Sequence, residues 1–319
     1  MAPKKAAGKA HQNSTNGEVT TKSDGKQHDA SSSSKQDTRK RKAQDTPVKE
    51  PAKTSRRSSR TNAPSKPDPI KLVNFLLSAE ALPLCRPKDE SADLESRPKG
   101  TRTYSTSPLS PFEELAAALI LSRPIGHMLG LRSIRTLFND PHQLNTPVAI
   151  QKAGKDGCWT VLDNARTQHK QKTAEELVLL AEAVKDHLGK NDNDVDLQAL
   201  RETSGKNVEQ EREMLKKHVK GVAKTGIDIF GRRIQSQWEE WYPFLDDRSV
   251  QALASFGLES DADQLKDFLD AHWDQVEQGQ FGEEGDALKR KVFAKVAERA
   301  LGAGLEGNVE AVARKVGDA

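Results

Sequence analysis

Apolar side chains recur at intervals of three and four residues over most of the chain beyond residue 108. The clearest run is 173–188, TAEELVLLAEAVKDHL. This spacing places the apolar positions on one face of a helix. Similar patterns predict further helices at 70–82, from Pro111 onward, 128–138, 146–154, 207–219, 225–242 and 247–256. No alternating apolar and polar stretch is longer than four residues, so the predicted fold class is all-α.

Residues that favour helix ends stand at several of these boundaries. Ser110 precedes Pro111, which predicts an N-cap followed by proline at the first helical position. Gly257 follows the helix 247–256 and predicts a left-handed C-terminal cap. Pro243 is expected to stop the helix 225–242.

The pattern divides the chain into four parts. Residues 1–68 are rich in Ser, Lys and Thr and nearly devoid of large apolar residues, so we expect disorder there. Residues 69–107 read as a short helix followed by a linker, and 108–258 as the helical domain. Residues 259–319 predict two or three more helices, an extension packed on that domain.

Charge separates the tail from the body. Residues 1–66 carry 16 Lys and Arg against 6 Asp and Glu, whereas residues 67–319 carry 34 against 41. A basic arm of this kind is typical of proteins that bind nucleic acid or an import receptor. Within it, Arg39, Lys40, Arg41 and Lys42 resemble a nuclear-localisation signal, so we expect an import receptor as partner and a nuclear location. The alternative is a solvated linker.

The sequence gives no sign of several other classes of protein. Cys85 and Cys158 form neither a CxxC pair nor a disulfide framework, and the histidines lack metal-site spacing, so we expect no metal and no cofactor. No apolar run approaches the roughly 20 residues that span a bilayer, so we expect no membrane partner. The N-terminal residues lack the apolar stretch of a secretory signal. We expect an intracellular monomer.

A short turn interrupts the helical pattern in the segment 218–234, HVKGVAKTGIDIFGRRI. Gly221 permits a tight turn and close approach of the backbone to another group. Thr225 is placed to cap the following helix, with Asp228 three residues on. Because a helix N-terminus offers free N–H groups to an anion, this turn is suited to hold a DNA phosphate. The alternative is a plain helix-to-helix turn with its lysines in solvent.

The helix after the turn is predicted to be amphipathic. Its expected buried stripe consists of Ile227, Phe230, Ile234, Trp238 and Trp241. The opposite face carries Arg232 and Arg233, which would contact phosphates if DNA lay along it. Otherwise these two arginines are expected to pair with nearby carboxylates of Asp228, Glu239 or Glu240.

The segment VKGVAKTGIDIF resembles the hairpin of the helix-hairpin-helix (HhH-GPD) DNA glycosylases, the endonuclease III-like superfamily. Four further segments resemble that family in the same order along the chain, together covering about residues 108–258: SPFEELAAALILS, LFNDPHQLNTPVAI, ARTQHKQKTAEELVLLAEAV and PFLDDRSVQALASFGL. The resemblance implies binding of duplex DNA through the hairpin residues Lys220, Gly221, Val222, Ala223, Lys224, Thr225 and Gly226.

The same resemblance implies a catalytic carboxylate at Asp246, or at Asp247 one register away. Such a group would activate water for release of a base extruded from the duplex. The other interpretation of Asp246, compatible with the first, is the N-cap of the helix 247–256. Thr225 stands where the family has its lyase lysine, and Lys224 falls one residue early. Because threonine cannot form a Schiff base, we expect no lyase activity.

Further departures from the family weaken the case for catalysis. Ala223 replaces the second hairpin glycine, and Arg123-Pro124 replaces the residues that fill the gap left by a flipped base. No cysteine follows Cys158, so the iron–sulfur loop of some members is absent.

Two hypotheses follow. The first is a nuclear DNA-binding protein of the base-excision-repair glycosylase type, either a monofunctional glycosylase using Asp246 or a catalytically inactive member. The alternative is a helical protein-interaction module that keeps the fold, favoured by the acidic body.

Overall fold

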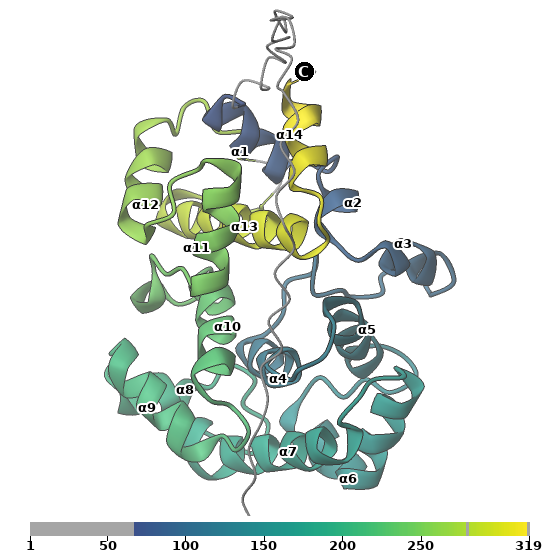
Figure 1. Ribbon diagram of the computed structural model, residues 1–319. Coiled ribbons are helices and arrows are strands. Elements are labelled where there is room, and N and C mark those ends of the chain that lie inside the picture. Colours follow the sequence, from purple (N-terminus) through teal and green to yellow (C-terminus); the bar gives the residue numbers. More distant parts are fainter. Residues whose placement is uncertain (1–66, 279–280, 318–319) are drawn as a thin grey trace, which may run out of the picture. The chain divides into compact units, whose positions relative to one another are not determined.

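The computed structural model describes residues 67–278 and 281–317 (Figure 1). Within these ranges every regular element is a helix and no strand occurs, which confirms the all-α expectation. Arg39, Lys40, Arg41 and Lys42 lie outside the described residues. The elements are α1 Pro69–Leu77, α2 Leu82–Cys85, α3 Lys88–Glu95, α4 Pro111–Leu121, α5 His127–Phe138, α6 Pro147–Asn164, α7 Lys170–Ala183, η1 Val184–Leu188, α8 Gln198–Thr203, α9 Val208–His218, α10 Lys224–Ile234, η2 Glu239–Trp241, α11 Asp247–Phe256, α12 Ala262–Ala271, α13 Gly285–Leu305 and α14 Val309–Gly317.

Local capping signals determine where several helices begin and end. At α4 the N–H of Glu113 donates to the Ser110 hydroxyl at 3.3 Å, and the N–H of Ser110 donates to the Glu113 carboxylate at 2.8 Å. α11 starts after Asp246 and ends at Gly257, which has a φ of 72°. These ends lie where the sequence predicts them, because each depends on a side chain or backbone preference at the terminus itself.

The helix predicted to reach Tyr242 ends earlier, at Ile234. The side-chain amide of Gln235 donates to the carbonyl of Phe244 at 2.9 Å and accepts from the N–H of Phe244 at 2.9 Å. This pair of bonds folds the chain back on itself, with η2 inside the loop. The prediction was wrong because the contact joins residues that local helical periodicity does not relate.

Two other segments also differ from expectation. Residues 83–107, expected as a linker, include most of α2 and all of α3, and Glu90 of α3 is buried against the guanidinium of Arg135 in α5. The short helix expected at 146–154 continues as α6 to Asn164, across a kink at Gly154.

One hydrophobic cluster, the central cluster, is built from residues between Tyr104 and Trp241. α6 packs along α7, and α4 packs against α10 (Figure 1). The predicted stripe of α10 and the residues after it is buried as expected: Ile227, Phe230, Ile234, Trp238 and Trp241. Phe230 lies edge-on to both tryptophan rings, with centroids 5.5 and 5.8 Å apart, which fixes the end of α10 in the core.

A second cluster, the terminal cluster, combines both ends of the described chain. It contains buried residues of α1 and α2 together with residues of α11, α12, α13 and α14. α13 contacts α1, α2 and α11, and it also contacts α10 beside the central cluster. The expected boundaries at 107 and 258 therefore do not separate these cores, because α11 packs with the C-terminal helices and α1 packs with them from the other end.

None of the helices in the described ranges is both long and apolar enough to cross a membrane.

Candidate nucleic-acid interface

The candidate interface is the turn between α9 and α10. α9 ends at His218 and α10 begins at Lys224, so only five residues, 219–223, connect them. Val222 and Gly226 are buried below the turn. The turn and the first residues of α10 present an exposed surface formed by Lys220, Gly221, Ala223, Lys224 and Thr225. The structure therefore brings the predicted hairpin residues together in one exposed turn anchored from beneath.

Gly221 is required at this turn for two reasons. Its φ is +88°, a backbone conformation that other residues adopt only with strain. A Cβ at this position would lie 2.5 Å from Cδ of Glu176 and 2.7 Å from Nη2 of Arg123. Arg123, after α4, and Glu176, in α7, form an ion pair that is almost fully buried. The backbone of the turn thus rests directly on this ion pair.

The N-terminus of α10 has no side-chain cap. Ala223 occupies the N-cap position and contributes no hydrogen bond. The expectation that Thr225 caps this helix is wrong, because the helix begins at Lys224 and Thr225 lies within its first turn. The first N–H groups of a helix lack intrahelical partners. With no side chain occupying them, they remain suited to an external anion such as a phosphate.

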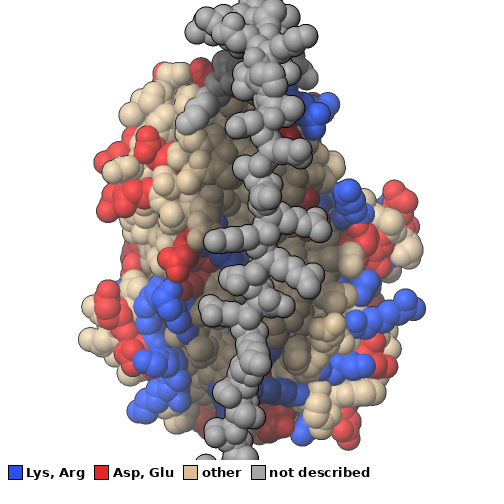
Figure 2. Space-filling view, in the orientation of Figure 1, with Lys and Arg blue, Asp and Glu red and all other residues tan. Residues whose placement is uncertain are grey.

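Lysines surround the turn. Lys216, Lys217, Lys220 and Lys224 are all exposed. Figure 2 shows basic side chains gathered over α9 and the start of α10. The described residues place no carboxylate within ion-pair distance of Lys220. This side of the molecule therefore offers positive charge next to the uncapped helix start.

Lys224 already has acidic neighbours. Its Nζ lies 2.9 Å from Asp228 and 3.5 Å from Asp247. The hydrogen bond and charge of Asp228, followed by the charge of Asp247, raise the pKa of Lys224, so the amine stays protonated at neutral pH. A phosphate at this position would compete with two carboxylates for the same ammonium group. Lys220, which has no carboxylate nearby among the described residues, is the better placed of the two lysines to contact a phosphate.

Arg232 and Arg233 do not lie on an exposed face, and this corrects the expectation that they contact phosphates. Arg232 is 4% exposed and pairs with Glu298, and with Asp246 at 2.8 Å. Arg233 pairs with Glu114 at 2.9 Å and lies over the ring of Tyr104.

The sequence did predict pairing as the alternative for these arginines, but with the wrong partners. Both turn inward because α4 and α13 bring carboxylates against α10. Burial opposes the charge of Arg232, yet the net effect of Glu298, Tyr104 and Asp246 is to raise its pKa.

Asp246 is the N-cap of α11 and is buried. Its Oδ1 accepts from the N–H of Ser249 at 2.9 Å, and its Oδ2 accepts from Arg232 at 2.8 Å. Only 7% of the residue is exposed. A general base must reach the water that it activates. Because both oxygens of Asp246 are engaged, this geometry suits a structural carboxylate better than a catalytic one.

Asp247 lies in a different environment. Its side chain is 87% exposed and faces Lys224 across 3.5 Å. It has no enclosing pocket, and a water beside it would be bulk solvent. Asp247 thus contributes charge to the surface of the hairpin rather than a shielded catalytic group.

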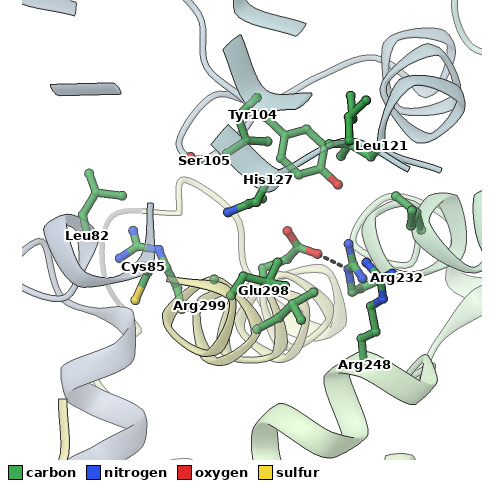
Figure 3. Close-up of a pocket in the computed structure, with 16 residues that line it drawn as sticks. Leu82, Cys85, Tyr104, Ser105, Leu121, His127, Arg232, Arg248, Glu298 and Arg299 are labelled. Carbon is green, nitrogen blue, oxygen red and sulfur yellow. Dashed lines mark hydrogen bonds and ion pairs between the residues drawn. The ribbon is translucent and has the colours of Figure 1, made fainter. Parts of the chain in front are cut away.

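A cavity of about 170 Å³ lies beside Arg232 (Figure 3). Its walls come from α2, α4, α5, α10, α11 and α13, and they include His127, Arg248 and Glu298 as polar groups. The hydroxyl of Tyr104 is buried there and has no hydrogen-bond partner among the described residues. Asp246 does not line this cavity. Ligand pockets usually measure about 300–1,000 Å³, so the cavity is small for an extruded nucleotide.

The described part of the chain contains no cluster of metal-ligating side chains and two buried cysteines. No group of three or more His, Cys, Asp or Glu side chains is arranged there to hold a metal ion. Cys85 and Cys158 are buried, and burial raises the pKa of each thiol to about 11. Such thiols stay protonated and unreactive at neutral pH.

The sequence reasoning missed Arg123 and Glu176 as the support of the hairpin. Their ion pair joins two segments more than 50 residues apart. The one available signal was the arginine at the position where the glycosylases have a gap-filling residue. The structure places that side chain beneath the turn.

Comparison with known proteins adds no relatives: no family model, no curated protein and no solved structure matches the chain.

Proposed function

We propose that this protein binds duplex DNA through the exposed hairpin at residues 220–226, with a backbone phosphate at the start of α10. One observation carries the proposal. The helix start is uncapped, in an exposed turn held by a buried ion pair and flanked by lysines. An anion at this point would satisfy free N–H groups and gain from the helix dipole. The resemblance of the hairpin and of four other segments to the HhH-GPD glycosylases supports the same function.

We do not propose that Asp246 excises a base. This carboxylate is buried, caps α11 and is paired with Arg232, and the cavity nearby is small. Thr225 cannot supply the amine of a lyase. The protein is therefore proposed as a catalytically inactive relative that keeps the DNA-binding hairpin. The basic arm would strengthen DNA binding, and its residues Arg39, Lys40, Arg41 and Lys42 would direct nuclear import.

The test compares charge reversal at the hairpin with charge reversal elsewhere. Binding of a fluorescent 20-base-pair duplex would be measured at several salt concentrations, for the full chain and for residues 67–319. The double variant Lys220→Glu/Lys224→Glu is expected to bind at least about tenfold more weakly. The slope of log affinity against log salt should become shallower by about one, because the contact to that phosphate is lost.

A matched control separates site from net charge. Lys155→Glu/Lys190→Glu changes the net charge by the same amount at two exposed lysines, one in α6 and one in the loop after η1, and each lies beside a carboxylate, as Lys224 does. It should keep most of the wild-type affinity. If both double variants lose the same amount of DNA affinity, binding depends on net charge and not on the hairpin. If residues 67–319 bind no DNA, the proposal is wrong, and the alternative of a protein-interaction module is favoured.

A further inference from the structure

A second hollow, the α4–α13 cleft, lies apart from the hairpin and has a volume of about 590 Å³. Its walls come from α1, the loop before α4, α4, the end of α10 with the residues that follow it, the segment before α13, and α13. The charged side chains on it are Arg233, Lys291, Lys295 and Arg299, together with Glu114, Glu283 and Glu298. Apolar walls include Leu77, Leu109 and Ala294. The volume lies within the range of small-molecule sites.

The carboxylates of the cleft are already committed to other cations. Glu114 forms a two-point contact with Arg233, at 2.9 and 3.1 Å. Glu298 pairs with Arg232 and lies 3.6 Å from Arg233. Glu283 pairs with Lys291. These pairs leave no carboxylate for Lys295.

Lys295 is one of two cleft cations, with Arg299, that have no carboxylate partner among the described residues. Among the described residues, no carboxylate lies within ion-pair distance of its amine and no hydrogen bond to it is formed, although it lines the cleft. Its neighbour Arg299 reaches the carbonyl of Ser78 at 3.3 Å, but the Nε of Arg299 has no partner in the same residues. Four cations therefore face three carboxylates on this surface.

The lack of a counter-charge affects the protonation of Lys295. Burial, together with the charges of Arg233 and Arg299, lowers the pKa of Lys295 to about 8, and the charges of Glu298 and Glu114 offset this only in part. Lys295 is half-buried, and a charge that loses part of its hydration is costly unless it is paired. An anion in the cleft would supply the missing partner, and the apolar walls would bury the remainder of such a molecule.

We propose that the α4–α13 cleft binds a small carboxylate with an apolar body, and that Lys295 pairs with the carboxylate group. The proposal is independent of DNA binding, because none of the hairpin residues 220–226 lines the cleft. Its ligand is one negatively charged group on a compact apolar frame, since the cleft carries one more cation than carboxylates.

Benzoate is the probe, and benzamide, of the same shape without charge, is its control. Titration of the full chain by calorimetry at pH 7 should show binding of benzoate at least about tenfold tighter than that of benzamide. Lys295→Met keeps an unbranched apolar side chain and removes the charge, so it should weaken benzoate binding at least about tenfold. Lys289→Met makes the same change in the same helix, at a lysine paired with Asp270 outside the cleft, and should change binding less than about twofold.

Dependence on pH gives a second readout. In the wild type, benzoate should bind about tenfold more weakly at pH 9 than at pH 7, because Lys295 loses its proton near pH 8. The other charged groups on the cleft are Arg233, Lys291, Arg299, Glu114, Glu283 and Glu298. Their titration remains in Lys295→Met, so this variant should show a much flatter profile.

One measurement needs no variant. Benzoate should protect Lys295 in the wild-type chain from acetylation by acetic anhydride, as measured by mass spectrometry of its peptide, while Lys289 reacts unchanged. Failure of benzoate to bind at 10 mM, equal binding by Lys295→Met, or acetylation of Lys295 unaffected by benzoate would each overturn the proposal.

Discussion

Glu211 is a buried carboxyl in the first helix of the hairpin. It accepts hydrogen bonds from the indole N–H of Trp241 and, at 3.2 Å, from the Ser204 hydroxyl. Burial raises its pKa, assisted by the charge of Glu240, and the hydrogen bonds only partly offset this. A carboxyl whose pKa is higher in the folded state stabilises the fold most below its ordinary pKa. That contribution is lost as the pH rises through the raised value.

Glu211→Gln should therefore gain stability relative to the wild type as the pH rises. The glutamine oxygen can still accept from Trp241, but it carries no charge to bury. We expect the difference in free energy of unfolding to shift in favour of the variant by on the order of 1 kcal/mol between pH 4 and pH 8. Urea unfolding at both pH values measures it.

Glu213→Gln is the matched control for that prediction. Glu213 lies on the same helix, but its side chain is 73% exposed. The free energy of unfolding of Glu213→Gln should stay within about 0.5 kcal/mol of the wild-type value at both pH values. A Glu211→Gln difference that does not change with pH would show that Glu211 titrates normally in the fold.

At the scale of elements, α11 depends on Asp246 for both its start and its connection to α10. Asn caps helices about as well as Asp, so Asp246→Asn keeps the bond to Ser249. It removes the charge that faces Arg232 in a buried site. Loss of one partner of a buried pair leaves an uncompensated charge, although Glu298 remains beside Arg232. We expect a loss of about 2–4 kcal/mol in the free energy of unfolding, with DNA affinity unchanged in the folded variant.

The same substitution at α12 provides the comparison. Asp261 caps α12 by accepting from the N–H of Gln264 at 3.1 Å, and it is exposed. Asp261→Asn should change stability by no more than about 0.5 kcal/mol. Both changes remove one charge from an N-cap, so the excess loss at Asp246 measures its pairing. Equal effects at the two positions would mean that Asp246 acts as a cap alone.

Elements that depend on neighbouring residues were predictable from the sequence. Ser110 and Gly257 set helix ends by local hydrogen bonds and backbone preference, and the apolar stripe after Ile227 follows from periodicity alone. The faces of Arg232 and Arg233 were not predictable in the same way. Their partners include Glu114 and Glu298, which approach from distant parts of the chain. No local pattern shows which carboxylate will be opposite a buried arginine.

At the scale of the whole described chain, the same reasoning explains why the clusters were missed. Asn74 donates to the carbonyl of Gln275 at 2.9 Å, and Asn308 donates to that of Leu84 at 2.8 Å. Each bond joins residues more than 200 positions apart. The apolar pattern of 70–82 predicted a helix but not its partner. Periodicity identifies which face of a helix is buried, whereas the surface that covers it depends on the path of the chain.

The terminal cluster therefore predicts that α1 is required for the C-terminal helices to fold. Leu72, Val73 and Leu76 of α1 are at most 1% exposed. Burial of each such side chain contributes about 1.5–3 kcal/mol, so removal of all three approaches the total stability of an ordinary domain. Residues 67–319 should unfold cooperatively, whereas residues 80–319 should bind a hydrophobic dye and show a smaller dependence of unfolding free energy on urea.

Single substitutions in the full chain test the role of α1 without truncation. Leu76→Ala should lower the free energy of unfolding by about 2–5 kcal/mol, because it leaves a cavity in the terminal cluster. Lys71→Ala, at an exposed position of the same helix, should change it by less than about 0.5 kcal/mol. If residues 80–319 unfold with the urea midpoint and slope of 67–319, α1 is dispensable and the terminal cluster is stable without it. The expected loss of stability would instead show that α1 is part of the core that positions α11 and Asp246 beside α10.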